Sequence, residues 1–208
     1  MPLKNFVICL AAYPKSLGPA QAALKSGQQH GWDIELFPGV DGSTVTVDQL
    51  VAQWGIRINT DNRKCQRQMY ERSGVRGCFL SHWLLWHKCA DLEETIGIFE
   101  HDVAFLKPPG NFSQFQDVLK LVEGFDPRRP MPAGVWYEGS GGYLVTPAGA
   151  KKLIDWTLLN GCLPSDVAIG RDVVDIVLCQ DNYVQLVRGR TDVDKRVDSF
   201  TWNLESMK

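Results

Sequence analysis

The stretch that decides the fold is GCFLSHWLLWHKCADLEETIGIFEHD, residues 77–102. Its first part, residues 77–92, is apolar on almost every side at helical spacing, which is typical of a buried helix. The run from Thr95 to Phe99 is short and apolar, which predicts a buried strand. Charged side chains follow this strand directly, and in open α/β sheets ligands bind beyond the carboxyl ends of the strands.

Strand-like and helix-like stretches alternate on both sides of this segment. We predict strands at residues 5–10, 33–37 and, around a glycine-rich turn, within 134–145. We predict helices at residues 19–30, 47–54, 113–123 and 146–160. The apolar runs 172–179 and 182–187 fit either element. This order predicts an α/β fold with a mostly parallel central sheet flanked by helices.

Length and composition are those of an ordinary globular protein. The chain has 208 residues, and we expect one domain spanning 1–208 with a partly irregular tail at 188–208. A net charge of -2 argues against nucleic-acid binding by bulk charge. We expect no transmembrane segment, and residues 6–10 resemble a core strand more than a signal peptide. Six cysteines without a Cys-x-x-Cys pair indicate reduced thiols and a cytoplasmic location.

Residues 56–76 form a basic segment. It carries six lysines and arginines against Asp61 and Glu71, with few apolar residues. Because it has so few apolar residues, we expect this segment to be a long surface loop. Long loops in compact domains are often functional. Arginine binds phosphate oxygens in a bidentate manner, so we expect the loop to close over an anionic ligand through Arg72 or Arg76.

The acidic triplet Glu100, His101 and Asp102 follows the strand Thr95–Phe99. In extended backbone, residues i and i+2 project to the same side, so we expect both carboxylates to face one site. Two neighbouring carboxylates repel and need a cation. Mg²⁺ and Mn²⁺ prefer oxygen ligands, and either ion can neutralise a diphosphate leaving group.

The sequence resembles glycosyltransferase family 25, which includes bacterial lipopolysaccharide galactosyltransferases and collagen galactosyltransferases. Four ordered motifs carry the resemblance. The first is a Gly-Cys-x-x-Ser-His helix, here Gly77, Cys78, Ser81 and His82. The second is a strand ending in Glu-Asp-Asp, here Glu100, His101 and Asp102. The others are FPGVDG at 37–42, which contains Asp41, and GGYLVTPAGAKKLI at 141–154, which contains Tyr143.

The resemblance implies a single Rossmann-like domain of the GT-A type and transfer of a sugar, with inversion, from a nucleoside diphosphate sugar to a hydroxyl. A UDP-hexose is the expected donor, and a surface glycan or lipopolysaccharide the expected acceptor. Mn²⁺ or Mg²⁺ is expected on Asp102 and Glu100. The expected donor-binding residues are Glu100, His82, Arg76, Arg72, Tyr143 and Asp41.

Inversion in one step needs a general base to deprotonate the acceptor, usually a carboxylate. The candidates that follow the glycine-rich turn are Glu138, Asp166 and Asp172. We favour Asp166, because the segment LPSDVAIG lies where the family has a Pro-x-Asp segment.

Two departures from the family leave other functions open. His101 replaces the middle aspartate of the triplet, and no arginine precedes Arg57. These departures favour the alternative of a catalytically silent relative that binds a nucleotide sugar or a partner. A phage enzyme that glycosylates modified DNA is a further alternative, which the small size of the chain fits.

Two other sites are conceivable within the same stretch. A Ser81–His82–Asp102 hydrolase is disfavoured, because neighbouring helical residues point about 100° apart and no Gly-x-Ser-x-Gly elbow is present. A zinc site made by Cys78, His82, His87 and Cys89 is disfavoured, because His87 points away from the face that the other three approach.

Overall fold

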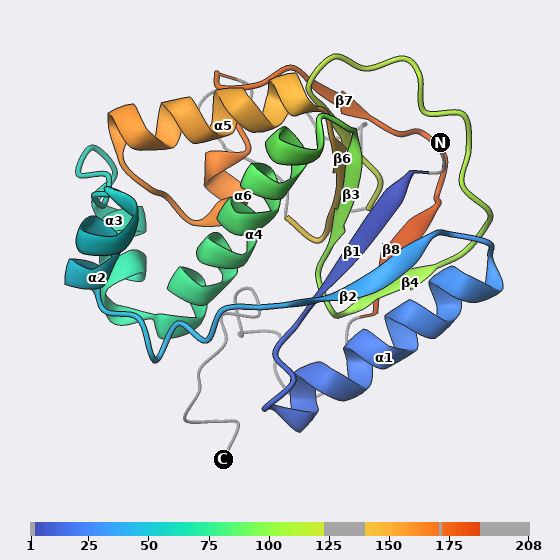
Figure 1. Ribbon diagram of the computed structural model, residues 1–208, viewed down its shortest axis with the longest axis horizontal. Coiled ribbons are helices and arrows are strands. Elements are labelled where there is room, and N and C mark those ends of the chain that lie inside the picture. The colour runs from blue at the N-terminus through green and yellow to red at the C-terminus, as the bar shows by residue number, and fades with distance from the viewer. Residues whose placement is uncertain (1–2, 123–139, 171, 188–208) are drawn as a thin grey trace.

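The computed structural model describes residues 3–122, 140–170 and 172–187 (Figure 1). The elements, in chain order, are β1 (Lys4–Cys9), α1 (Pro14–Gln29), β2 (Ile34–Pro38), α2 (Val47–Trp54), α3 (Arg63–Glu71), α4 (Ser73–Leu92), β3 (Ile96–Phe99), β4 (Val103–Phe105), β5 (Val118–Lys120), β6 (Gly142–Val145), α5 (Pro147–Asn160), α6 (Ser165–Ala168), β7 (Ile176–Leu178) and β8 (Val184–Leu186). Among these residues, no helix is both long and apolar enough to cross a membrane.

The main sheet has six strands in the order β2-β1-β3-β6-β5-β7. β1 pairs in parallel with β2 and β3, and β5 pairs in parallel with β7. β6 is antiparallel to both of its neighbours. Five of the six strands therefore run the same way, which confirms the expected α/β fold with a mostly parallel sheet. β4 and β8 form a separate antiparallel pair.

Helices cover both faces of the sheet (Figure 1). Alternate residues of β1 point to opposite faces. Phe6 belongs to the hydrophobic cluster that includes α4 and α5, whereas Val7 belongs to the cluster that includes α1. Burial of both faces explains why the strands are continuous apolar runs.

The buried helix predicted for residues 77–92 is α4, which begins at Ser73, four residues before the expected start. Trp86 and Phe79 are fully buried on it, and Trp83 is almost so. The short helix expected at 47–54 is α2, with a complete Thr46–Gln49 capping box. The helix expected at 146–160 is α5, with the Thr146 side chain accepting a hydrogen bond from the Gly149 amide.

The helix predicted for residues 113–123 is wrong. The segment contains the strand β5, which lies between β6 and β7. Val118 and Leu119 are both buried although they point to opposite faces. The apolar spacing of this segment fits a helix as well as a strand buried on both sides, and pairing with two neighbouring strands decides between them.

The loop predicted for residues 56–76 is also wrong. Asn62 caps helix α3 by accepting a hydrogen bond from the Cys65 amide, and α4 begins at Ser73. Cys65 and Met69, four residues apart, are buried beneath the charged face of α3. These two residues pack α3 against the core. Their spacing of four residues is the helical signal that the loop prediction did not take into account.

Candidate functional site

A pocket lies where three parallel strands end. Ile8 and Leu10 reach it from β1, Asp41 and Gly42 from the segment after β2, and Glu100 from the end of β3. Its empty volume, open to solvent, is about 510 Å³. The remaining lining residues are Ser16, Val40, Gly74, Gly77, Cys78, Ser81 and His101. The pocket therefore occupies the carboxyl edge of β2, β1 and β3, where α/β proteins bind ligands.

Two glycines let the segment after β2 contact the first turns of α4. A Cβ atom on Gly42 would lie 1.8 Å from the Ser73 carbonyl oxygen, and one on Gly77 would lie 2.4 Å from the Val40 carbonyl oxygen. Ser81 completes the contact, because its hydroxyl accepts a hydrogen bond from the Val40 amide and donates one to the Gly77 carbonyl. Two of the sequence motifs thus form one wall of the pocket.

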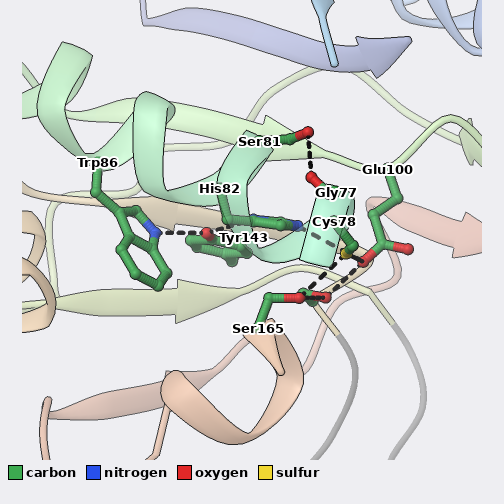
Figure 2. A network of polar contacts seen from close by, with 9 residues as sticks. Gly77, Cys78, Ser81, His82, Trp86, Glu100, Tyr143 and Ser165 are labelled. Carbon is green, nitrogen blue, oxygen red and sulfur yellow. Dashed lines mark hydrogen bonds and ion pairs between the residues drawn. The ribbon is translucent and has the colours of Figure 1, made fainter. Parts of the chain in front are cut away.

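Glu100 is the centre of a polar network at the end of the pocket (Figure 2). Its Oε1 atom accepts a hydrogen bond of 2.5 Å from the Ser140 hydroxyl and lies 3.9 Å from Cys78 Sγ. The same oxygen lies 3.7 Å from His82 Nε2. Ser165 Oγ connects Cys78 and Ser140, at 3.2 Å from the sulfur and 2.9 Å from Ser140 Oγ.

A buried aromatic chain supports His82 from behind. His82 Nδ1 lies 2.9 Å from the Tyr143 hydroxyl, which also accepts a hydrogen bond from Trp86 Nε1 (Figure 2). Neither His82 nor Tyr143 has exposed surface. Neither is among the described lining residues of the pocket, and their role in donor binding stays a prediction.

The three residues of the acidic triplet have different electrostatic environments. Burial disfavours the charge on Glu100, but the nearby His82 ring and the Ser140 hydroxyl hold its pKa below the usual value. Burial lowers the pKa of His101 to about 4, so this imidazole is neutral at pH 7. Burial, with the charge of Glu100, raises the pKa of Asp102 to about 6.

The expectation that both carboxylates of the triplet, Glu100 and Asp102, face one site is not met by the described pocket. Residues 101 and 102 form a turn, so the alternation of an extended strand does not apply to them. Glu100 and His101 line the pocket, and Asp102 is not among its described lining residues. Asp102 Oδ1 is buried and has no hydrogen-bond partner among the described residues. The metal role of Asp102 stays a prediction.

Asp166 lies in the first turn of α6, directly after Ser165 of the Glu100 network. Desolvation by the surrounding protein and the charge of Glu100 raise the pKa of Asp166. The side chain itself is exposed. Glu138, the other base named in the sequence analysis, lies outside the described residues, and Asp172 is exposed near the start of β7.

The other expected donor-binding residues surround or flank the pocket. Asp41 lines it and accepts hydrogen bonds from the Tyr13 hydroxyl and from the amide and hydroxyl of Ser43, which hold its pKa low despite partial burial. Arg72 is exposed at the junction of α3 and α4.

Arg76 donates hydrogen bonds to four backbone carbonyl groups. They belong to Gly42, Val45, Met69 and Tyr70. This guanidinium therefore connects the segment after β2 with the end of α3, which is a structural role. Contact with a diphosphate stays a prediction for Arg76.

The variant Arg76→Met is expected to lower the free energy of unfolding by about 2–3 kcal/mol, because four hydrogen bonds from a charged donor to backbone carbonyls, three of them partly buried, are lost. Urea unfolding measures this change. The control is Arg67→Met, whose side chain is 69% exposed and pairs with Glu71 at 3.8 Å, and which should change stability by less than about 0.5 kcal/mol. Unchanged stability of Arg76→Met combined with weaker nucleoside diphosphate binding would restore the diphosphate role.

Neither the Ser-His-Asp hydrolase site nor the four-ligand zinc site considered from the sequence is formed. Ser81 bonds to backbone groups rather than to His82. Cys89 Sγ donates to the carbonyls of Glu94 and Val145, away from Cys78. One atom each of Cys78, His82 and Glu100 nevertheless lies within 4.8 Å of the others, an arrangement that can hold a metal ion. All six cysteines are free thiols, as expected.

Sequence reasoning missed three members of the Glu100 network. Cys78 was considered as part of a motif and of a disfavoured zinc site, but not as a neighbour of Glu100, although it lies four residues before His82 and so on the same helical face. Ser165 precedes the favoured base directly. Nothing in the sequence singled out Ser140, because its contact with Glu100 joins positions 40 residues apart.

Comparison with known proteins gives one family. The sequence model described as "Glycosyltransferase family 25 (LPS biosynthesis protein)" matches residues 3–124. A glycosyltransferase 25 family member of Aedes aegypti is 28% identical over 157 residues, which are 65% of this chain and 26% of that protein. The lipooligosaccharide biosynthesis protein lex-1 of Haemophilus influenzae is 29% identical over 140 residues, which are 53% of this chain and 45% of that protein. This chain thus spans about a quarter to a half of the length of these relatives.

Solved structures give weaker likenesses. The apo-form glycosyltransferase GlyE of Streptococcus pneumoniae has a TM-score of 0.46 and 10% identity, over 91% of this chain and 55% of that one. A mutant Drosophila β-1,4-galactosyltransferase 7, in complex with manganese, UDP-Gal and xylobiose, has a TM-score of 0.43 and 12% identity, over 99% and 79% of the two chains.

Proposed function

This chain belongs to glycosyltransferase family 25, and from this premise we propose that it transfers a sugar from a nucleoside diphosphate sugar, with UDP-hexose as the donor, to an acceptor hydroxyl with inversion. The observation that carries the proposal is the pocket at the carboxyl edge of β2, β1 and β3, which contains the ionised Glu100. The pocket opens to solvent at the edge of the sheet where α/β proteins bind ligands.

We assign a divalent cation, Mn²⁺ or Mg²⁺, to the carboxylates that follow β3. Asp102 Oδ1 is a buried oxygen without a described partner, and Glu100 is held in its charged form. Carboxylate oxygens are the ligands that these hard ions prefer. Asp102 and Glu100 would hold the ion, which when bound supplies positive charge that stabilises the diphosphate leaving group.

The chain's own residues would do the remaining work. His82, supported by Tyr143 and Trp86, holds the Glu100 carboxylate in place from inside the core. Asp166 would accept the proton of the acceptor hydroxyl, and its raised pKa brings it closer to the pH at which a general base is most effective. Glu138 is the alternative base.

The acceptor and the setting are also proposals. A surface glycan or lipopolysaccharide is the acceptor that the family's description suggests, and a cytoplasmic site and a single domain over 1–208 complete the proposal. A catalytically silent binding relative is the second candidate, because His101 replaces an aspartate of the family triplet and is neutral at pH 7.

A panel of nucleotide sugars tests this function by thermal shift, with and without Mn²⁺. The expected donor raises the melting temperature by several degrees in a Mn²⁺-dependent way, since a ligand at 100 times its Kd stabilises by about 2.7 kcal/mol. Glu100→Gln should lose this shift, and the exposed Asp155→Asn should keep it. Slow release of sugar to water, measured in parallel, separates an enzyme from a silent relative. No shift with any nucleotide sugar would contradict the proposal.

A further inference from the structure

A second kind of metal site lies at the same end of the pocket, made of ligands of a different chemical class. Cys78 Sγ, His82 Nε2 and Glu100 Oε1 all lie within 4.8 Å of one another, with 3.9 Å between sulfur and oxygen and 3.7 Å between nitrogen and oxygen. We propose that these three side chains bind a thiophilic divalent ion, Zn²⁺ above all, with the fourth position open to the pocket.

The spacing of the three atoms suits tetrahedral zinc. Bonds of about 2.3 Å to sulfur and about 2.0–2.1 Å to nitrogen and oxygen place neighbouring ligand atoms about 3.3–3.5 Å apart. The two measured separations exceed these values by about half an ångström or less. The third separation, between Cys78 Sγ and His82 Nε2, is at most 4.8 Å, so side-chain rotations must bring the three atoms closer to one another around the ion.

An unpartnered buried nitrogen points to the ligand independently. His82 has no exposed surface, and its Nε2 atom has no hydrogen-bond partner among the described residues. The distance of 3.7 Å to Glu100 is too long for a hydrogen bond. Figure 2 shows this nitrogen directed toward Cys78 and the Glu100 carboxylate. A bound ion would give this nitrogen a direct bond in place of the long 3.7 Å approach to Glu100.

The other ring nitrogen supports the same assignment. Histidine ligands usually donate their second N–H to a fixed acceptor, which sets the tautomer. Here His82 Nδ1 faces the Tyr143 hydroxyl at 2.9 Å, and that hydroxyl is itself held by Trp86 Nε1. With Nδ1 donating to Tyr143, the Nε2 lone pair is free for the ion.

An ion reaches the site through the pocket, since Cys78 and Glu100 line it and His82 lies behind them. On binding, the Cys78 thiol loses its proton to solvent and the sulfur forms the metal bond as a thiolate. Because the ion would engage Glu100, zinc would also inhibit sugar transfer; this consequence alone rests on the proposed function.

Cobalt(II) reports such a site by its colour, whether or not the protein transfers sugar. Metal-free protein titrated with Co²⁺ is expected to bind one equivalent, with a thiolate-to-cobalt charge-transfer band and strong tetrahedral bands that Zn²⁺ abolishes. Mn²⁺ should not displace the cobalt, because thiolate and imidazole ligands favour Co²⁺ and Zn²⁺ over Mn²⁺.

Matched variants assign the ligands. Cys78→Ser should lose the charge-transfer band, while Cys179→Ser, a similarly half-buried cysteine at the end of β7, should keep it. Tyr143→Phe keeps all three ligands and should weaken Co²⁺ binding by about 10–100-fold. Circular dichroism identifies variants that fail to fold, and if Cys78→Ser is one of them, Tyr143→Phe decides. Absence of the band in the parent protein, its survival in Cys78→Ser, or unchanged affinity in Tyr143→Phe would overturn the site.

Discussion

Replacing Asp102 by asparagine is expected to lower the turnover of sugar transfer by about 10³-fold or more, because the ion that we propose on Asp102 would supply several kcal/mol of stabilisation to the departing diphosphate. The same variant is expected to be at least as stable as the parent. Asp102 Oδ1 is buried without a described partner, and burial with the nearby Glu100 charge raises the pKa of Asp102 to about 6.

The sign of the stability effect follows from that raised pKa. A carboxyl group that binds its proton more tightly in the folded state lowers stability once the pH exceeds the unfolded pKa, and the cost is complete above about pH 6. Asparagine removes this cost, so the free energy of unfolding at pH 7.5 should rise by about 1–3 kcal/mol. Steady-state kinetics at saturating Mn²⁺ and urea unfolding measure the two effects.

Asp155→Asn is the matched control for Asp102→Asn. Asp155 is exposed on α5 and forms an exposed ion pair with Lys151 at 2.9 Å, so its loss should leave turnover unchanged and stability nearly so. Near-normal turnover of Asp102→Asn, or full activity of the parent protein in EDTA, would remove the metal from the proposed mechanism.

The second large effect is expected for Asp166→Asn, which keeps the shape of the side chain but cannot take a proton. Transfer should fall by about 10²–10⁴-fold, the usual contribution of a general base. Donor binding should stay within a few-fold, because Asp166 is not among the described lining residues of the pocket. Single-turnover transfer and nucleotide-sugar binding by calorimetry separate the two quantities.

Glu138→Gln distinguishes the two candidate bases. If Glu138→Gln abolishes transfer and Asp166→Asn does not, the base is misassigned but the inverting mechanism stands. If neither variant loses activity, a single-base mechanism is ruled out for this chain.

The sequence predicted those parts of the fold whose local pattern has one reading. The segment 77–92 is too apolar for anything but a buried helix, and Thr146-Pro147 begins α5 at the expected residue. The pattern failed at residues 113–123 and 56–76. The apolar residues of 113–123 have a spacing that fits a helix, but the segment contains a strand that is buried on both faces. In 56–76, the two buried residues of α3, Cys65 and Met69, are surrounded in the sequence by charged residues.

The sequence motifs indicated where the site lies, but not how its side chains are arranged. Glu100, Asp41 and the first turns of α4 line one pocket, and the sequence had singled out all three through the family motifs. The relation between Glu100 and Asp102 was inferred from an extended backbone, and a turn at residues 101 and 102 changes it. Arg76 was assigned to a ligand because arginine suits phosphate, but its donors engage four backbone carbonyls.

The sequence by itself determined the family, the α/β class and the edge of the sheet at which the site lies, because these depend on hydrophobic periodicity and on short motifs of neighbouring residues. Only the tertiary structure decided which side chains surround Glu100. Ser140, Ser165 and Tyr143 reach that site from segments 40 or more residues along the chain. Such contacts depend on how strands and helices pack, and no local pattern records them.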